Sequence, residues 1–201
     1  IIKGLSAFGM TPEEGVIGFN EESGNYGPYQ QSKRKDIYQC FAKELVKNGL
    51  AYPCFCSEDD LNNLRAKQEE LNLDDKGYYG EYATCRNLSF EEIEENIKAG
   101  KSYVLRLRSP GEKDRRITFE DVIKGKIEMP ENIQDVVLLK TDGIPTYHFA
   151  HAVDDHLMGT TLVIRGDEWL SSVPLHLQLF QTLGFKAPKY AHIAPIMKEE
   201  N

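Results

Sequence analysis

The chain has 201 residues, of which 40% are hydrophobic and 28% are charged, and its formal net charge is −8. These values are typical of a globular protein and exclude a disordered or fibrous chain. No apolar run approaches the roughly 20 residues of a membrane span, and no secretory signal is visible. The negative charge disfavours non-specific coating of DNA, although a local basic patch can still bind nucleic acid. Four cysteines without a signal indicate a reducing compartment.

The amino-terminal part predicts two helices separated by a loop. A helix is expected to end within residues 1–9, and a loop containing Gly, Asn and Pro follows to about Tyr29. Ser32 is expected to cap the second helix, which Gly49 ends. One face of this helix is apolar and consists of Ile37, Tyr38, Phe41, Ala42, Leu45 and Val46. Cys40 lies beside that face and is expected to pack in the core.

The middle of the chain predicts short strands and polar helices. Ser57 is expected to begin one helix that is charged almost all round and therefore exposed, and Ser89 begins another as part of a capping box with Glu92. Strands are expected at residues 50–56, 103–108, 117–119, 126–128 and 135–140. This composition indicates a lobe inserted into, or attached to, another domain.

The last quarter of the chain has a different pattern. Thr161–Arg165 is a nearly continuous apolar run, which predicts a strand buried on both faces. A helix with Pro174 in its first turn and Gly184 at its end follows, and residues 190–197 form the next predicted strand. A strand, a helix and a strand in this order predict a parallel α/β sheet.

Cys54, Cys56 and Cys85 could supply three ligands of a tetrahedral zinc site. The gap between the first two cysteines is shorter than usual, and no histidine is near enough to be an obvious fourth ligand. Candidates for that position are Tyr82, Tyr79 and Tyr78. The alternative is three unrelated core cysteines, because free cysteine is commonly buried.

Histidines and carboxylates are also dense between residues 148 and 156. On a helix, His148, His151 and Asp155 would share one face and could form the metal site of a hydrolase. The alternative is the polar wall of a pocket.

Arg165 ends a predicted strand, where ligands of open α/β sheets bind. Its guanidinium could hold a carboxylate through two hydrogen bonds, or it could form an internal ion pair. Tyr147 and Trp169 belong to the same candidate site. A basic stretch in this acidic chain consists of Arg106, Arg108, Lys113, Arg115 and Arg116. It could contact a phosphate backbone or could form a solvated strand edge.

Five stretches resemble bacterial-type glutamyl-tRNA synthetases, which are class I aminoacyl-tRNA synthetases, and they follow the order of that family. They are GPYQQSKR (27–34), AYPCFC (51–56), CRNLS (85–89), TDGIPTYHFAHAVDDHLMG (141–159) and TLVIRGDEWLSS (161–172). The last two are the most specific. The resemblance extends from about residue 1 to the end of the chain.

The resemblance implies an incomplete class I nucleotide-binding (Rossmann-like) α/β fold with an inserted α+β lobe that binds the acceptor stem. Residues 1–52 would end the first Rossmann-like half, residues 53–140 would form the lobe (the connective peptide), and residues 141–201 would start the second half. The HIGH-like and KMSKS-like motifs of the family do not occur in the sequence. We therefore expect the chain to be an internal fragment of the catalytic region that is inactive alone.

The resemblance also implies residue roles. The glutamate and adenylate pocket would be lined by Tyr147, Arg165 and Trp169, with the arginine bound to the side-chain carboxylate of the substrate. Glu168 would approach ATP, and His151 stands where some relatives have an asparagine that contacts the substrate. Asp142 and Tyr147 would face the tRNA acceptor end, and Arg106 and Arg108 would lie in the lobe that meets tRNA. Zinc at the cysteines gains support, with Tyr82 as the tyrosine ligand that could replace a histidine of the family.

The implied activity is glutamate–tRNA ligation, in which ATP with Mg²⁺ activates glutamate and the glutamyl group passes to the 3′ end of tRNA(Glu). The implied protein is a cytoplasmic monomer with a possible structural Zn²⁺ and no membrane partner. Two alternatives are a metal-dependent hydrolase built on His148, His151 and Asp155, and a non-catalytic RNA-binding module.

Overall fold

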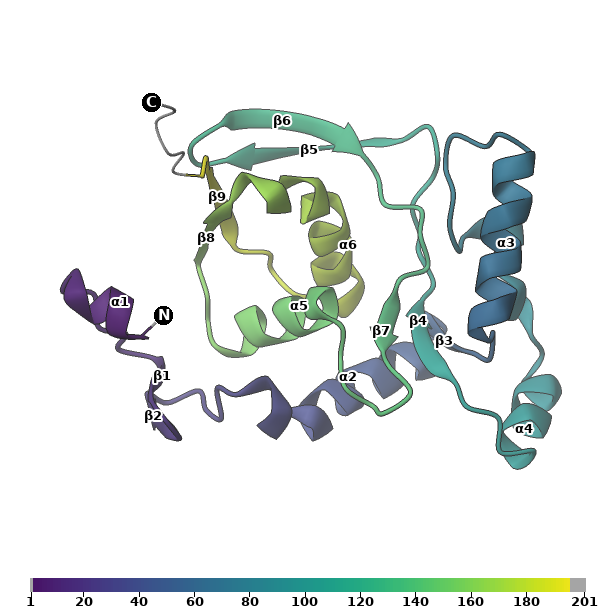
Figure 1. Cartoon of the computed structure of the whole chain (residues 1–201), viewed down its shortest axis with the longest axis horizontal. Helices are drawn as coiled ribbons and strands as arrows, with labels where there is room; N and C mark the ends of the chain where they lie inside the picture. Colours follow the sequence, from purple (N-terminus) through teal and green to yellow (C-terminus); the bar gives the residue numbers. More distant parts are fainter. Residues whose placement is uncertain (1, 196–201) are drawn as a thin grey trace, which may run out of the picture.

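The structure is a computed structural model that describes residues 2–195 (Figure 1). The helices are α1 (Ile2–Ala7), α2 (Lys35–Lys47), α3 (Glu58–Glu70), α4 (Phe90–Lys98), α5 (Tyr147–Leu157) and α6 (Val173–Leu183). The strands are β1 (Gly15–Gly18), β2 (Glu21–Ser23), β3 (Ala51–Cys54), β4 (Val104–Leu107), β5 (Arg116–Asp121), β6 (Gly125–Pro130), β7 (Val137–Leu139), β8 (Leu162–Gly166) and β9 (Lys189–Ile193). Short 3₁₀ helices are η1 (Gln31–Lys33), η2 (Gly80–Tyr82), η3 (Thr84–Asn87) and η4 (Asp167–Ser172).

Two larger sheets organise the chain. One is antiparallel with the order β3-β4-β7, and the other has the order β6-β5-β9-β8. In the second sheet β8 and β9 are parallel, as predicted for the strand–helix–strand segment, and α6 connects them. The parallel connection places Arg165 of β8 opposite His192 of β9, so the carboxyl ends of the two strands meet at one edge of the sheet.

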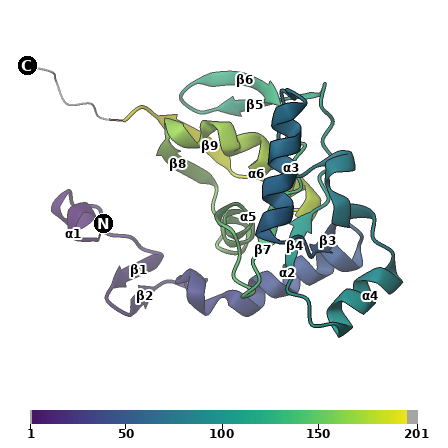
Figure 2. The ribbon, with the colours of Figure 1, turned by 45° about the vertical axis from the view of Figure 1, so that its right-hand side comes forward.

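The main core lies between α2, α5, α6 and the β3-β4-β7 sheet (Figures 1 and 2). Its fully buried side chains include Tyr38, Ala42, Leu107, Leu138, Phe149, Val153 and Leu179. A smaller core surrounds Cys54, Tyr78 and Cys85, on the side of the molecule where α3 and α4 lie. Burial of these apolar side chains is the principal stabilising contribution, at about 25 cal/mol per Å² removed from water.

The helix boundaries follow from their capping residues. Ser57 and Ser89 both form complete capping boxes, with Asp60 and Glu92 respectively, as the sequence indicated for the two helix starts. Ser32 is not the cap of α2, because it lies in the 3₁₀ turn η1 and the helix begins only after Arg34. The 3₁₀ helix η1 leads directly into α2, and because Ser32 lies inside η1 it cannot serve as the N-cap of α2.

Two other local predictions are wrong. The predicted loop before Tyr29 contains the β1–β2 hairpin, whose two-residue turn places Asn20 at a φ of 58°. These strands are too short for an alternation of apolar and polar residues to be visible in the sequence. Cys40 is exposed instead of packed in the core, because it lies on the solvent side of α2.

Strand β8 is not buried on both faces. It is the edge of its sheet, and its alternate side chains Leu162 and Ile164 are 41% and 63% exposed. An apolar run fits either a central strand or an edge strand with one covered face, and only the strand order distinguishes them. The predicted strand 190–197 begins as β9, and residues 196 and 197 lie outside the described part of the chain.

The limits at 52/53 and 140/141 stay a prediction. The sheets join residues across these limits, since β5, within 53–140, pairs with β9, within 141–201. None of the helices in residues 2–195 is both long and apolar enough to cross a membrane.

Candidate amino-acid site and metal centre

Arg165 lies at the carboxyl end of β8, beside the equivalent end of β9. Its Nε donates to His192 Nε2 at 3.0 Å, its Nη1 donates to His176 Nδ1 at 3.1 Å, and its Nη2 donates to the Trp169 carbonyl at 3.3 Å. The guanidinium carbon also lies 4.9 Å from the centre of the Tyr190 ring, within the range of a cation–π contact.

These contacts leave donors free on Arg165. A guanidinium has five N–H groups, and the three contacts above use one on each nitrogen, so one N–H remains on Nη1 and one on Nη2. Among residues 2–195 no carboxylate contacts Arg165, so the internal ion pair considered from the sequence does not form there. The arginine therefore keeps its charge and two donors for a ligand.

Tyr147 and Trp169 lie beside this arginine. Their ring centroids are 4.5 Å apart, and Trp169 lies 6.0 Å from the guanidinium carbon of Arg165. Tyr147 is the first residue of α5 and is 49% exposed, whereas Tyr190 is 2% exposed at the base of the site. Burial raises the pKa of Tyr190, so its hydroxyl stays protonated.

His151 lies beneath Tyr147, with the two rings nearly parallel and their centroids 6.1 Å apart. Its Nδ1 is 2.6 Å from Asp155 Oδ2 and its Nε2 is 2.9 Å from the Tyr190 hydroxyl. The nearby carboxylate favours the proton on Nδ1, so Nε2 accepts from Tyr190. His151 thus belongs to the wall of the site, and both of its nitrogens already have protein partners.

The hydrolase site considered from the sequence does not assemble. His148 Nδ1 faces His176 Nε2 at 2.8 Å, while His151 faces Asp155 and Tyr190. In the described part of the chain, the only group of three or more His, Cys, Asp or Glu ligand atoms that lie close together is the cysteine cluster. Helical spacing did place these side chains on α5, but packing against α6 and β9 turns each one to a different partner.

Glu168 and Asp142 occupy separate places. Glu168 is exposed in η4 and folds back over Gly166, where an added Cβ would lie 2.1 Å from its carboxylate. A side chain at position 166 would therefore displace the Glu168 carboxylate. Asp142 caps the turn after β7 by accepting from the Ile144 amide at 2.9 Å, and it lines a pocket to which Arg165 does not contribute.

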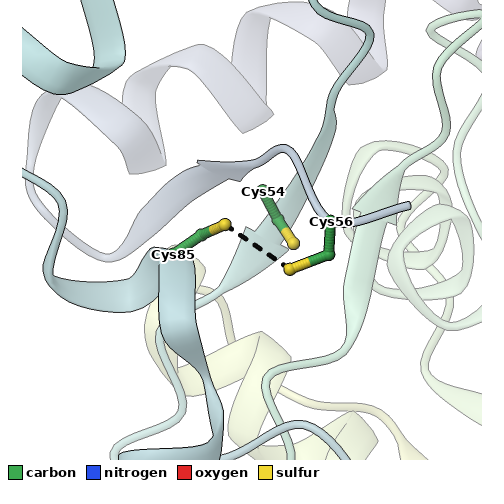
Figure 3. Close-up of side chains that lie close together, drawn as sticks. All are labelled: Cys54, Cys56 and Cys85. Carbon is green, nitrogen blue, oxygen red and sulfur yellow. Dashed lines mark hydrogen bonds between the residues drawn. The ribbon is translucent and has the colours of Figure 1, made fainter. Parts of the chain in front are cut away.

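The three cysteines predicted to bind metal come together, from β3 and from η3 (Figure 3). Their sulfur atoms all lie within 4.8 Å of one another, and Cys56 Sγ is 3.6 Å from Cys85 Sγ. Two thiolates on a tetrahedral zinc ion, each at about 2.3 Å from the metal, lie about 3.8 Å apart. Hydrogen bonds from Cys56 and Cys85 lower the pKa of Cys54, and the same contacts raise the pKa of Cys56, so Cys54 is the thiol that ionises first.

The tyrosine whose hydroxyl contacts these sulfur atoms is Tyr78, whereas Tyr82 lines the same pocket without such a contact. The Tyr78 hydroxyl lies 3.4 Å from Cys54 Sγ and 3.2 Å from Cys56 Sγ, and it accepts from the Cys85 amide at 2.9 Å. Tyr82 lies in η2 and stacks edge-on against Tyr79. The Phe55 amide also donates to Cys85 Sγ at 3.4 Å, the kind of outer hydrogen bond that supports metal-bound thiolates. The donor set and its support therefore fit zinc.

The basic stretch does not form a free phosphate-binding surface. Arg106 is 8% exposed, donates to the Asp135 carbonyl at 2.9 Å and covers the Tyr78 ring, so its side chain is engaged within the chain, and its contact with tRNA stays a prediction. Arg106 lies on the same face of β4 as Val104, and the small core around Tyr78 covers that face. Arg108 donates to the Gly49 and Arg86 carbonyls at 3.1 and 2.6 Å, which ties β4 to its surroundings. The remaining members pair with nearby carboxylates: Lys113 with Asp75, Arg115 with Glu112 and Glu131, and Arg116 with Glu128.

Three lysines that sequence reasoning did not single out form a different basic surface. Lys43 of α2, Lys101 and Lys140 line a pocket of about 430 Å³ together with Tyr103 and Asp142. All three are exposed, and none makes an ion pair with another described residue. We call this surface the lysine groove. It could not be found in the sequence because its lysines come from three distant segments.

Sequence reasoning also missed three buried residues near Arg165. His176 and His192 contact the guanidinium, and Asp121 contacts His192. His176 and His192 are fully buried, and Asp121 is 1% exposed. The only local signal for Asp121 was its position, since it follows a predicted strand and begins the turn Asp121–Gly125. Nothing local links it to His192, which is 71 residues away.

A parallel β8-α6-β9 unit with Arg165 and His192 at the carboxyl ends of its strands is typical of open-sheet α/β proteins of the nucleotide-binding type. Residues 1–201 match the family described as "tRNA synthetases class I (E and Q), catalytic domain", and the chain belongs to that family.

Relatives of the chain agree with this assignment. It is 56% identical over 197 residues to a glutamate–tRNA ligase of Clostridium perfringens, covering 98% of this chain and 36% of the relative. A glutamate–tRNA ligase of Acetivibrio thermocellus is 50% identical, over 100% of this chain and 36% of the relative. A solved glutamate–tRNA ligase from Elizabethkingia meningosepticum, in complex with its amino acid, has a TM-score of 0.85 and 37% identity, and covers 100% of this chain and 39% of that structure. The chain thus spans about a third of the length of these relatives.

Proposed function

We propose that this chain contributes the amino-acid pocket of a cytoplasmic glutamate–tRNA ligase, which activates glutamate with ATP and transfers it to tRNA(Glu). The observation that carries the proposal is the state of Arg165. Its guanidinium is held by neutral groups, and two N–H groups on different nitrogens remain free. A bidentate carboxylate requires such a pair of donors, and glutamate carries a carboxylate on its side chain.

The aromatic residues complete the pocket in this proposal. Tyr147 and Trp169 would cover the ligand from the α5 and η4 sides, and Glu168 would stand toward ATP. The chemistry is an in-line attack of the glutamate α-carboxylate on the α-phosphate, and these residues would contribute by positioning the amino acid. Magnesium would enter with ATP. No carboxylate cluster suited to Mg²⁺ is found within residues 2–195, where the cysteine cluster is the only such group of metal ligands.

The lysine groove supports tRNA as a partner. Its three unpaired lysines stand out in a chain of net charge −8, and phosphate contacts by lysine dominate the affinity of most nucleic-acid complexes. The groove includes Asp142, which belongs to the turn expected to face the acceptor end. Zinc would hold Cys54, Cys56, Cys85 and Tyr78 together and so stabilise the part of the chain that follows β3.

The test is aminoacylation by a full-length enzyme that carries this chain, with labelled glutamate, ATP and total tRNA. Arg165→Ala should raise the glutamate KM by about 100-fold or more, because an unpaired buried carboxylate costs about 3–5 kcal/mol. Arg116→Ala is the matched control, since Arg116 is exposed and pairs only with the exposed Glu128. Failure of the folded wild-type enzyme to charge any tRNA would refute the proposal, and an Arg165→Ala change below about threefold would move the carboxylate contact elsewhere.

A further inference from the structure

We propose that Asp121 and His192 are positioning residues for Arg165. Asp121 fixes the tautomer of His192 so that its ring presents a lone pair, not a proton, to the Nε–H of Arg165. This inference rests on the proposed function, because it assigns the device that aims the arginine at the substrate carboxylate. Asp121 does not touch the ligand site, and it lies on β5, in the segment expected to belong to the inserted lobe.

The Asp121 carboxylate is held in one orientation. Its Oδ1 accepts from the Ile123 amide at 3.0 Å and the Lys124 amide at 2.9 Å. Its Oδ2 accepts from the His192 amide at 3.1 Å and lies 2.7 Å from His192 Nδ1. Both side chains are at most 1% exposed. The His192 amide also lies 3.4 Å from Oδ1, but only Oδ1 accepts from Ile123 and Lys124, and only Oδ2 faces the imidazole.

These contacts determine where the His192 proton lies. Arg165 Nε can only donate, so His192 Nε2 at 3.0 Å must accept and cannot carry a proton. The proton is then on Nδ1 and is donated to Asp121 Oδ2. A ring protonated on both nitrogens would oppose two donors at 3.0 Å. Hydrogen bonds from His192 and three backbone amides outweigh burial and lower the pKa of Asp121 to about 2, so the acceptor stays ionised.

His176 holds the opposite side of the guanidinium in the same manner. Its Nδ1 accepts from Arg165 Nη1 at 3.1 Å, so its proton is on Nε2, which donates to His148 Nδ1 at 2.8 Å. Burial, together with the neighbouring His151 and Arg165, lowers the pKa of His176 to about 2 and keeps the ring neutral. Two imidazoles thus orient the guanidinium without neutralising its charge. A carboxylate in direct contact would occupy the arginine in place of the substrate.

Asp121→Asn is the informative substitution because it preserves the shape of the side chain but replaces one acceptor oxygen by a donor NH₂ group. Two amides, those of Ile123 and Lys124, donate to Oδ1, whereas the single His192 amide lies 3.1 Å from Oδ2 and 3.4 Å from Oδ1, so we expect the new amide nitrogen at the Oδ2 position. It would then donate to His192 Nδ1 and move the ring proton to Nε2. Two donors would face each other between His192 and Arg165, and the guanidinium would turn away.

The test uses the full-length enzyme and glutamate-dependent ATP–pyrophosphate exchange, with KM measured separately for glutamate and ATP. Asp121→Asn should raise the glutamate KM about 10- to 100-fold, the usual effect of losing an orienting partner, and leave the ATP KM within about twofold. The matched control is Asp135→Asn, because Asp135 is fully buried and hydrogen-bonded to Tyr52 and Ser109, away from Arg165. If Asp121→Asn acted only by disturbing the packing, it would change the ATP KM together with the glutamate KM, or it would lower the folded fraction of the enzyme. Asp135→Asn would then have the same effects.

A direct readout is the ¹⁵N shifts of the histidine ring nitrogens in labelled enzyme. The wild type should show His192 protonated on Nδ1, and Asp121→Asn should show it protonated on Nε2. His192→Gln, which can offer an amide oxygen to Arg165, should keep more glutamate affinity than His192→Leu, and this pair serves if Asp121→Asn does not fold. A wild-type proton on Nε2, or an unchanged glutamate KM in folded Asp121→Asn, would overturn the inference. If Arg165→Ala also left the glutamate KM unchanged, the carboxylate contact would lie elsewhere, whereas the proposed function would fail only if the folded wild-type enzyme charged no tRNA.

Discussion

Arg34 Nε donates to Asp154 Oδ1 at 2.8 Å, although the two residues are 120 positions apart in the sequence. The Tyr38 hydroxyl donates to the other oxygen of the same carboxylate at 2.7 Å. Arg34 is 1% exposed and also donates to the Pro28 carbonyl at 2.8 Å. One ion pair therefore fastens the start of α2, and the loop before it, to the middle of the helix that carries Tyr147 and His151.

Arg34→Ala should lower the free energy of unfolding by about 3–5 kcal/mol, because it leaves the Asp154 charge without its partner in a largely buried setting. Urea unfolding of the chain provides the measurement. Lys98→Ala removes the exposed pair with Glu94 and should cost less than about 1 kcal/mol. Equal effects of the two substitutions would mean that the Arg34 pair contributes no more than a surface contact.

The cysteine cluster should retain about one zinc ion per chain. Cys56→Ser should abolish binding, and Tyr78→Phe should weaken it far more than Tyr82→Phe, because only the Tyr78 hydroxyl lies at the sulfur atoms. Metal content after dialysis against a graded chelator separates the variants. Equal zinc retention by the two tyrosine variants would exclude Tyr78 as a ligand. A greater loss of zinc with Tyr82→Phe would favour Tyr82, the ligand expected from the sequence.

The lysine groove should contact tRNA phosphates. Replacing Lys43, Lys101 and Lys140 by alanine should weaken tRNA binding and reduce the slope of log K against log salt by up to about 3, roughly one for each lost contact. Lys47→Ala is the control for Lys43→Ala, since it lies on the same helix and pairs with Glu44. Filter binding at several salt concentrations would measure the slopes, and an unchanged slope would remove the groove from the interface.

Stability should decrease as the pH falls below about 6.5, in part through His176. Burial, with nearby positive groups, lowers the pKa of His176 from 6.5 to about 2 in the folded chain. The unfolded chain then binds a proton between these values that the folded chain does not, so acid favours unfolding by up to about 1.4 kcal/mol per pH unit. His176→Gln should flatten this dependence between pH 7.5 and 5, as measured by urea unfolding. Replacement of the exposed His156 by Gln should leave it unchanged, and a parallel slope in both variants would contradict the assignment.

Residues with purely local causes were predictable. The capping boxes at Ser57 and Ser89, the amphipathic face of α2 and the turn residues that end the helices each depend on neighbours within a few positions. The grouping of Cys54 and Cys56 with Cys85 was predictable as a hypothesis, because closely spaced cysteines are a common pattern of zinc ligands. Local preference failed at Ser32, where η1 precedes the helix, and in β8, where strand order decides exposure.

The sequence by itself determined the family, the parallel strand–helix–strand unit and the residue types at the end of β8, since these depend on motifs and short-range periodicity. Only the tertiary structure decided that Arg106 is buried, that the Tyr78 hydroxyl contacts the cysteines, and that Asp121 and His192 stand behind Arg165. The reason is physical. The partner of a buried polar group is selected by packing of distant segments, and each donor must find an acceptor there. Spacing along the chain does not specify that pairing.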